Sequence, residues 1–290
     1  MGADGNGIEV WPGPMEGVAS AEFVRAANAL GVVPRWMTPF IRLSSGVPGK
    51  RKTEAFLAPF LEGGVPVTAQ LMGTDAALIA RAAELCLELG AAGIDLNFGC
   101  PSRRVVNGGA GGGILRDPGR AAALLAAVGK ALPDVPLSVK MRTGFVKFDE
   151  FGDLFSRLRD TGAAQKFFIH YRTVKELYRD VPFRNARFDR IAGIASGVPL
   201  ILNGDISSAD EARELAGRTR CAGVMCARTW MRDPFLLRRI EGKNVPDPAA
   251  GRERFYAELL HAGVGGGARI ELAKLLFGAD DPHFLELVGR

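Results

Sequence analysis

The stretch at residues 94–118, IDLNFGCPSRRVVNGGAGGGILRDP, decides how the rest of the chain is interpreted. Its apolar beginning, residues 93–97, predicts a short buried strand. The sequence FGCP at residues 98–101 then ends that strand, because glycine frees the backbone for a turn and proline removes an N–H donor. We therefore expect Cys100 on a loop just past the carboxyl end of a strand.

The sequence that follows this turn is rich in glycine. Residues 108–113 hold five glycines and predict a flexible loop that could pass close to a ligand. Asp117 as N-cap and Pro118 at the first helical position then predict the start of a helix. A thiol on a loop at a strand end, followed by such a segment, is the feature that any functional interpretation must explain.

Strand-like and helix-like runs alternate on both sides of this stretch. Regular alternation predicts an α/β protein with a (β/α)8 TIM barrel. An open doubly wound sheet is the alternative, but the Gly-x-Gly-x-x-Gly turn after its first strand is absent here. Eight strands are expected at residues 7–11, 36–43, 65–72, 93–97, 136–141, 166–171, 198–203 and 223–226. The helices between them are expected at residues 21–30, 54–61, 75–89, 118–132, 148–160, 188–195, 208–215 and 232–240.

The pattern changes near residue 246, where only helix-like runs follow. We predict a barrel domain at residues 1–245 and a short helical domain at residues 246–290. Helices are expected there at residues 252–262, 269–277 and 282–288.

Composition limits the choice of function. The chain has 290 residues, of which 47% are hydrophobic, and its 37 basic and 32 acidic residues give a net charge of +5. This mild excess is compatible with a polyanionic partner without requiring one. No apolar run approaches the ~18 residues of a membrane span, and the start lacks the pattern of a secretory signal. The four cysteines form neither a disulfide framework nor a C-x-x-C metal pair, so we expect a cytoplasmic protein with reduced thiols.

Polar residues lie at the expected ends of several strands and indicate a site for an anionic ligand. Lys140 ends the fifth strand, where an unpaired ammonium is costly unless a carboxylate or a ligand meets it. Arg228 follows the eighth strand, the region in which barrels commonly bind phosphate. Gln70, His170 and Asn203 offer directional hydrogen bonds at other strand ends. A flat phosphorylated cofactor such as flavin mononucleotide (FMN) would suit these groups, although their spacing does not name it.

Structural roles are the alternatives for the same residues. Cys100 could be a buried packing thiol. Lys140 could belong to an ion pair in the barrel core, and His170 could be a satisfied core histidine.

Several motifs, taken together and in order, resemble the tRNA-dihydrouridine synthases over roughly residues 8–240. The segment Asn97-Phe98-Gly99-Cys100-Pro101 carries most of the resemblance. Residues 106–113 look most like the bacterial branch that modifies uridine 16 in the D-loop of tRNA. The other matching motifs are PMEGV at residues 14–18, LRDP at 115–118, SVKMR at 138–142, His170 with Arg172-Thr173, and NGD at 203–205.

The resemblance implies an FMN-binding barrel with a helical tRNA-binding domain, reduced by NADPH and acting as a monomer on the D-loop of tRNA. Hydride would pass from reduced FMN to C6 of the uracil, and Cys100 would protonate C5. A thiol with the ordinary pKa of ~8.5 is mostly protonated at neutral pH and can act as this acid. The implied cofactor-binding residues are Pro14, Met15, Glu16, Gln70, Lys140, His170, Asn203, Gly204, Asp205, Ala227 and Arg228. The implied substrate-binding residues are Asn97, Arg42 and Arg172, with basic loops at residues 50–52, 103–104 and 172–187 holding the RNA backbone.

The chain also departs from the family pattern. Tyr171 and Ala227 stand where the family usually has glycine, and Pro39 replaces a common acidic residue. The helical part after residue 246 is shorter than usual.

Two other functions are kept as alternatives. One is a different FMN barrel oxidoreductase that acts on a free pyrimidine, similar to dihydroorotate dehydrogenase. The other is a tRNA-binding protein without catalytic activity, against which Cys100, Lys140 and His170 argue.

Overall fold

A computed structural model describes residues 7–44 and 46–289. Residues 1–6 of the predicted barrel domain, Ser45 ahead of the predicted basic loop at 50–52, and Arg290 of the predicted helical domain lie outside the described residues.

The strands of the described chain form one parallel sheet in the order β1-β9-β8-β7-β6-β5-β4-β2, and β3 also pairs with β4. Parallel pairing along the whole order, with a helix after each strand position, confirms the predicted (β/α)8 barrel. The strands are β1 (Glu9–Pro12), β2 (Trp36–Met37), β3 (Ile41–Arg42), β4 (Val67–Met72), β5 (Gly93–Phe98), β6 (Leu137–Arg142), β7 (Lys166–His170), β8 (Leu200–Asn203) and β9 (Gly223–Cys226).

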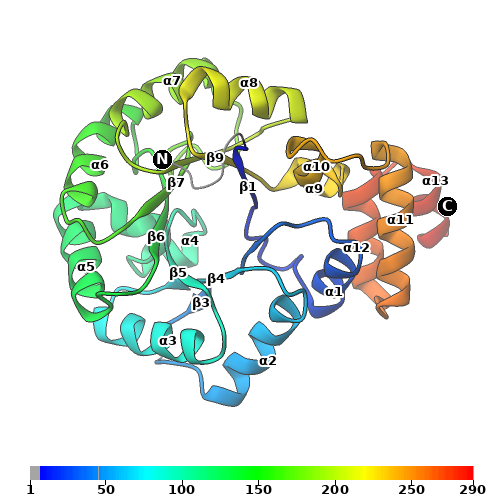
Figure 1. Ribbon diagram of the computed structural model, residues 1–290, viewed down its shortest axis with the longest axis horizontal. Coiled ribbons are helices and arrows are strands. Elements are labelled where there is room, and N and C mark those ends of the chain that lie inside the picture. Colours follow the sequence, from blue (N-terminus) through cyan, green and yellow to red (C-terminus); the bar gives the residue numbers. More distant parts are fainter. Residues whose placement is uncertain (1–6, 45, 290) are drawn as a thin grey trace.

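Helices surround the strands in the view of Figure 1, and the last three helices lie outside that ring, beside α1. The helices of the barrel are α1 (Ala21–Ala29), α2 (Lys50–Leu61), α3 (Ala76–Glu88), α4 (Arg103–Asn107), α5 (Pro118–Ala131), α6 (Phe151–Arg159), α7 (Arg184–Ile194), α8 (Ala209–Thr219), α9 (Arg228–Arg232) and α10 (Leu236–Ile240), with 3-10 turns η1 (Gly111–Arg116) and η2 (Phe148–Glu150). The outer helices are α11 (Pro248–His261), α12 (Gly266–Phe277) and α13 (Pro282–Leu287).

Side chains inside the barrel lie in layers, and β7 shows the pattern. Lys166, Phe168 and His170 are two residues apart, so they share the inner face of that strand. Lys166 lies at the amino end, where it meets Glu9 of β1 at 2.6 Å. Phe168 lies in the middle and packs edge-on against Trp11, with ring centroids 4.9 Å apart. His170 reaches the carboxyl end. An apolar layer thus separates two polar ends of the barrel.

The predicted second strand, residues 36–43, is wrong as one strand. The structure breaks it into β2 and β3 around Pro39. A proline has no N–H to give to the neighbouring strand, so the ladder with β4 is interrupted there. Helix α2 also begins at Lys50, four residues before its predicted start, so the basic residues 50–52 form its first turn rather than a loop.

The prediction of a flexible glycine loop at residues 108–113 is also wrong. Gly111, Gly112 and Gly113 belong to η1 and are buried. A Cβ on Gly112 would lie 2.6 Å from the side chain of Val174 and 3.0 Å from the carbonyl oxygen of Cys100. These glycines allow close packing beside the Cys100 loop, so the segment supports that loop instead of moving freely.

The predicted closing helix at residues 232–240 begins four residues late in the structure, as α10, and a separate helix, α9, precedes it. Helix α9 ends at Arg232 and α10 begins at Leu236, with Pro234 between them. Helices fill the predicted C-terminal segment, and Phe255 of α11 packs on Phe23 of α1 with ring centroids 5.3 Å apart. A separate domain at residues 246–290 stays a prediction. Within the described ranges, no helix is long and apolar enough to cross a membrane.

Candidate active site

Cys100 lies on the loop that leaves β5, at the C-terminal rim of the barrel, by which we mean the strand ends that lead into the helices. Its backbone N–H and that of Gly99 both donate to Oδ1 of Asn97, at 2.9 and 3.1 Å. Its carbonyl oxygen accepts from Gly112 N at 2.9 Å. The Cys100 side chain is partly exposed, so the alternative of a buried packing thiol is not what the structure shows.

The other three cysteines, all within the described residues, are buried. Burial raises the pKa of Cys86 to about 11 and that of Cys226 to about 12, so both stay protonated and enclosed. Cys100 is therefore the thiol of this chain that a ligand at the rim could reach.

A chain of buried polar side chains lies directly beneath this loop. Asn97 Nδ2 donates to Gln70 Oε1 at 2.8 Å, and Gln70 Nε2 donates to Asp95 Oδ2 at 2.8 Å. Ser138 Oγ donates to the other oxygen of Asp95 at 2.7 Å. Burial raises the pKa of Asp95 to about 7, against the lowering effect of these hydrogen bonds. The predicted site residues Gln70 and Asn97 are thus brought together by an acid that the sequence analysis did not single out.

Lys140 lies beside this chain on β6 and is half-buried. Its Nζ donates to Asn203 Oδ1 at 3.2 Å, and Asn203 Nδ2 donates to Met225 O at 2.8 Å. Burial and the nearby charge of Arg142 lower the pKa of Lys140 to about 8. Among the described residues no carboxylate lies within ion-pair distance of this ammonium. The charge of Asp95 raises this pKa but the two groups form no ion pair, so the ammonium is unmatched in the sense that it has no ion-pair partner. This favours a ligand over an ion pair as the reason for its position.

His170 ends β7 on the same rim. Its Nδ1 accepts from Arg172 N at 3.2 Å, which leaves the proton of the neutral ring on Nε2. Burial lowers the pKa of His170 well below its usual value, and the charges of Arg142 and Lys140 lower it further. The ring is therefore a neutral donor at the rim.

Asp205 and Arg228, both predicted at the phosphate end, are in contact, and Asp205 also binds Tyr171 and Arg172. Tyr171 Oη donates to its carboxylate at 2.9 Å, Arg172 pairs with it at 2.5 Å, and Arg228 forms a third contact. Burial alone would raise the pKa of Asp205, but these donors and charges outweigh it and lower the pKa. Tyr171 and Ala227, the two departures from the family pattern at this end, each lie against a glycine. A Cβ on Gly204 would lie 2.5 Å from the Tyr171 ring, and a Cβ on Gly13 would lie 2.6 Å from Cβ of Ala227.

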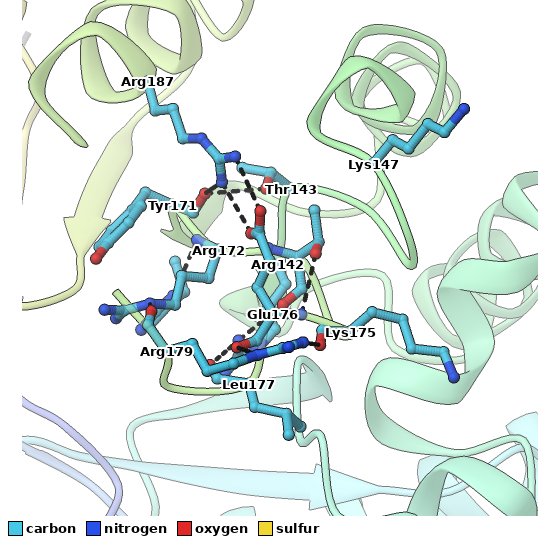
Figure 2. A network of polar contacts seen from close by, with 12 residues as sticks. Arg142, Thr143, Lys147, Tyr171, Arg172, Lys175, Glu176, Leu177, Arg179 and Arg187 are labelled. Atoms are coloured by element: carbon cyan, nitrogen blue, oxygen red, sulfur yellow. Dashed lines mark hydrogen bonds and ion pairs between the residues drawn. The ribbon is translucent and has the colours of Figure 1, made fainter. Parts of the chain in front are cut away.

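Two buried arginines, Arg142 and Arg172, belong to a polar network around the segment after β7 (Figure 2), and Arg142 joins that segment to the Cys100 loop. Arg142 donates to the carbonyl oxygens of Gly99 at 3.0 Å, Thr173 at 2.9 Å and Leu177 at 2.7 Å. Arg172 is 1% exposed and donates to Arg179 O at 2.7 Å. The structure therefore places Arg172 inside the network, and its guanidinium is not a free surface charge. The sequence signal for Arg142 was a charge within a buried strand.

The remaining predicted residues lie around the same rim. Pro14 and Met15 are half-buried and Glu16 is exposed, on the turn after β1, where Gly13 N donates to Cys226 O at 2.7 Å. Arg42 is half-buried at the end of β3, where it pairs in register with Met72.

A barrel whose C-terminal rim gathers a thiol, an unmatched ammonium and donors suited to phosphate defines the class of cofactor-dependent barrel enzymes. A model of the dihydrouridine synthase family matches residues 12–262. The chain belongs to this family, whose members are FMN-dependent oxidoreductases.

Similar proteins agree with that assignment. A protein named tRNA-dihydrouridine synthase B from Pseudomonas aeruginosa is 34% identical over 233 residues, 79% of this chain and 67% of its own length. Its namesake from Pseudomonas putida is 32% identical over 273 residues, 90% of this chain and 79% of its own. A tRNA-dihydrouridine(16) synthase from Cupriavidus necator is 33% identical over 237 residues, 79% of this chain and 72% of its own.

Solved structures show the same fold at low identity. A 2-naphthoyl-CoA reductase complex has a TM-score of 0.57 at 12% identity, covering 81% of this chain and 50% of that one. A variant of NCR from Zymomonas mobilis has a TM-score of 0.51 at 15% identity, covering 80% and 85%.

The donors at the rim fit FMN. Nη1 of Arg172 is buried with no hydrogen-bond partner among the described residues. Arg172 lines a cavity of about 1050 Å³ together with Tyr171, Asp205 and Arg228. An orphaned guanidinium nitrogen in a cavity with further cationic groups suits a phosphate. The unmatched charge of Lys140 suits an electron-rich ring.

Proposed function

We propose that this protein reduces a uridine in the D-loop of tRNA to 5,6-dihydrouridine, with Cys100 as the proton donor. The observation that carries the proposal is the placement of Cys100. It is the partly exposed thiol of the chain, it is fixed by two hydrogen bonds to Asn97, and it lies on the same rim as the unmatched Lys140. Family membership supplies the reaction class.

FMN, once bound and reduced by NADPH, would supply the hydride that reaches C6 of the uracil ring. Cys100 gives the proton to C5 from the other face of the base. The thiol must be protonated for this step, and the two hydrogen bonds from its loop to Asn97 fix the position from which it acts. Lys140 stabilises negative charge that develops at the reaction centre.

We propose that the remaining rim residues divide between cofactor and substrate as the resemblance implies. Gln70, His170 and Pro14–Glu16 would line the cofactor, and the groups around Asn203–Asp205 and Ala227–Arg228 would hold its phosphate. Asn97 and Arg42 would act on the substrate side. The resemblance assigns Arg172 to the substrate as well, but its buried Nη1 without a partner and its place in the cavity with Asp205 and Arg228 fit the cofactor phosphate better, and we propose that role for it.

The RNA backbone is proposed to cross the rim beside the Cys100 loop. Exposed Arg103 and Arg104 begin α4 directly after Cys100, and exposed Lys175 and Arg179 follow β7. Arg103 and Lys175 line one hollow of about 430 Å³ with Pro101. Lys50 is less suited to this role, because it pairs with Glu88 at 2.6 Å. Four cations around a thiol give the electrostatic attraction that RNA binding requires. The uridine must leave the RNA stack to reach Cys100.

The test is to map dihydrouridine, position by position, in tRNA from cells with and without this protein. The proposal predicts loss of dihydrouridine at one D-loop position, and we propose position 16 from the resemblance of residues 106–113. Relatives named tRNA-dihydrouridine synthase B are as similar to this chain as the tRNA-dihydrouridine(16) synthase, so the map must cover every D-loop position. An unchanged map would contradict it. Flavin reoxidation by a free pyrimidine, with no response to tRNA, would instead identify the alternative barrel oxidoreductase. A colourless protein that binds tRNA without modifying it would identify the non-catalytic alternative. Action as a monomer would be checked by light scattering.

A further inference from the structure

We infer that Asp95 is a positioning residue for Cys100: it fixes the direction of the Gln70 and Asn97 amides and, through them, the loop that carries the thiol. The inference rests on the proposed function only in taking Cys100 as the proton donor. Asp95 itself lies on β5, five residues before Cys100, with 0% exposure.

The direction of the hydrogen bonds follows from their chemistry. A carboxylate oxygen accepts from Gln70, so the Nε2 group of that amide must face Asp95 and its Oε1 must face Asn97. Oε1 then accepts from Asn97 Nδ2, which turns Asn97 Oδ1 toward the N–H groups of Gly99 and Cys100. Each of these four contacts measures between 2.8 and 3.1 Å.

The groups at both ends of this series of hydrogen bonds require the same orientation of the Gln70 and Asn97 amides. Backbone N–H groups can only donate, so a flipped Asn97 would set donors against Gly99 and Cys100. A flipped Gln70 would set its carbonyl against the carboxylate of Asp95. Gln70 has 0% exposure and Asn97 8%, so little water is at hand to repair a wrong orientation. A buried network of this kind is stable only when every member is satisfied.

Asp95 accepts the hydrogen bond from Gln70 in both of its protonation states. Its pKa of about 7 means that both protonation states occur near neutral pH. A proton on Oδ1 would face Ser138 Oγ, and that hydroxyl has a second acceptor, Ile94 O, at 3.3 Å. Oδ2 would still accept from Gln70. An asparagine at this position could satisfy the same partners, with its amide nitrogen toward Ser138.

Three variants separate the acceptor role of Asp95 from its charge and from its contact with Ser138. Asp95→Leu keeps the branched shape but accepts nothing, and Asp95→Asn keeps the acceptor but removes the charge. Ser138→Ala removes the other partner of Asp95 and leaves the chain to Cys100 intact. The readout is hydrogen exchange of the Gly99 and Cys100 amides in the flavin-loaded protein. The Ile94 amide, which donates to Pro136 O at 2.9 Å, serves as the internal reference.

Asp95→Leu should speed exchange of Gly99 and Cys100 about fivefold or more relative to Ile94, the effect of losing one well-formed buried hydrogen bond. Asp95→Asn and Ser138→Ala should exchange like the wild type. The kcat for dihydrouridine formation should fall in Asp95→Leu and be largely restored in Asp95→Asn.

Wild-type exchange in Asp95→Leu would overturn the inference, and so would faster exchange with unchanged kcat. A loss of kcat in Asp95→Asn as large as in Asp95→Leu would show that the charge of Asp95 acts directly, for instance on Lys140, which also overturns it. Failure of the wild-type protein to modify tRNA would refute the proposed function, while the exchange rates would still decide whether Asp95 positions the loop.

Discussion

Both ends of the barrel carry charged side chains, and the ends differ in how their inward-facing lysine is paired. At the amino end, Glu9 accepts from Lys166 at 2.6 Å and from Arg35 at 3.1 Å, and Trp11 adds a third hydrogen bond at 3.0 Å. At the carboxyl end, Lys140 donates to the neutral amide of Asn203 and has no ion-pair partner among the described residues. Charges that satisfy one another hold a fold together, whereas a charge left unmatched at a barrel rim indicates a ligand.

Replacing the lysine at each end by methionine tests the two assignments separately. Lys140→Met should lower the rate of uridine reduction about 100-fold, because the reaction centre loses its positive charge. The free energy of unfolding should stay the same or rise, since the buried and unmatched ammonium is removed. Single-turnover assays and urea unfolding measure the two quantities. A large loss of stability with normal turnover would show that the ammonium has a structural role.

Lys166→Met should have the opposite result. Glu9 would lose its shortest ion pair and keep Arg35, which should cost about 1–2 kcal/mol of unfolding free energy for these partly exposed groups. Turnover and flavin content should match the wild type. A drop in turnover without a drop in stability would contradict the assignment of this end to the fold.

The pH dependence of the unfolding free energy tests the contribution of the Lys166–Glu9 ion pair. Burial alone would raise the pKa of Glu9, but the hydrogen bonds and charge of Lys166 outweigh it and lower the pKa. A lowered carboxyl pKa contributes stability that is present above the unfolded value of ~4.3 and is lost as the pH falls through the folded value. Urea unfolding below that pH should therefore show a smaller acid loss in Lys166→Met than in the wild type.

Tyr171→Phe should have the smallest effect. The phenol donates to Asp205 at 2.9 Å, but Arg172 and Arg228 keep contact with that carboxylate. Loss of one of several hydrogen bonds should cost about 1 kcal/mol or less in unfolding free energy and in FMN binding, measured by urea unfolding and fluorescence titration. A much larger loss of FMN affinity would mean that the hydroxyl contacts the cofactor directly, and the carboxyl end would then hold one more functional group than we assign to it.

Local patterns in the sequence were enough to predict the barrel and the position of Cys100 at a strand end. Alternating strand and helix patterns predict the eight units, and the Gly99-Cys100-Pro101 turn places the thiol at a strand end. Asp117 caps α5 as predicted, accepting from Arg120 N at 3.0 Å. These features depend on neighbours in the chain, which is why they could be predicted.

Features that depend on distant residues were missed. The glycines after Cys100 predict backbone freedom, but Val174 on another strand's loop packs against them and removes it. Asp95 contacts Gln70 and Ser138, which are 25 and 43 residues away in the sequence. No local pattern shows that these side chains of three different strands will meet, so the position of Asp95 beneath Cys100 is seen only in the structure.

Dihydrouridine formation on unmodified tRNA by Cys100→Ala shows whether this thiol delivers the proton, with Cys86→Ala as the control for a buried thiol. We predict that Cys100→Ala keeps its flavin and loses at least about 100-fold in product formation, as expected when a general acid is removed. Cys86→Ala should form product at the wild-type rate. Product formation by Cys100→Ala at the wild-type rate would contradict the claim that this thiol delivers the proton.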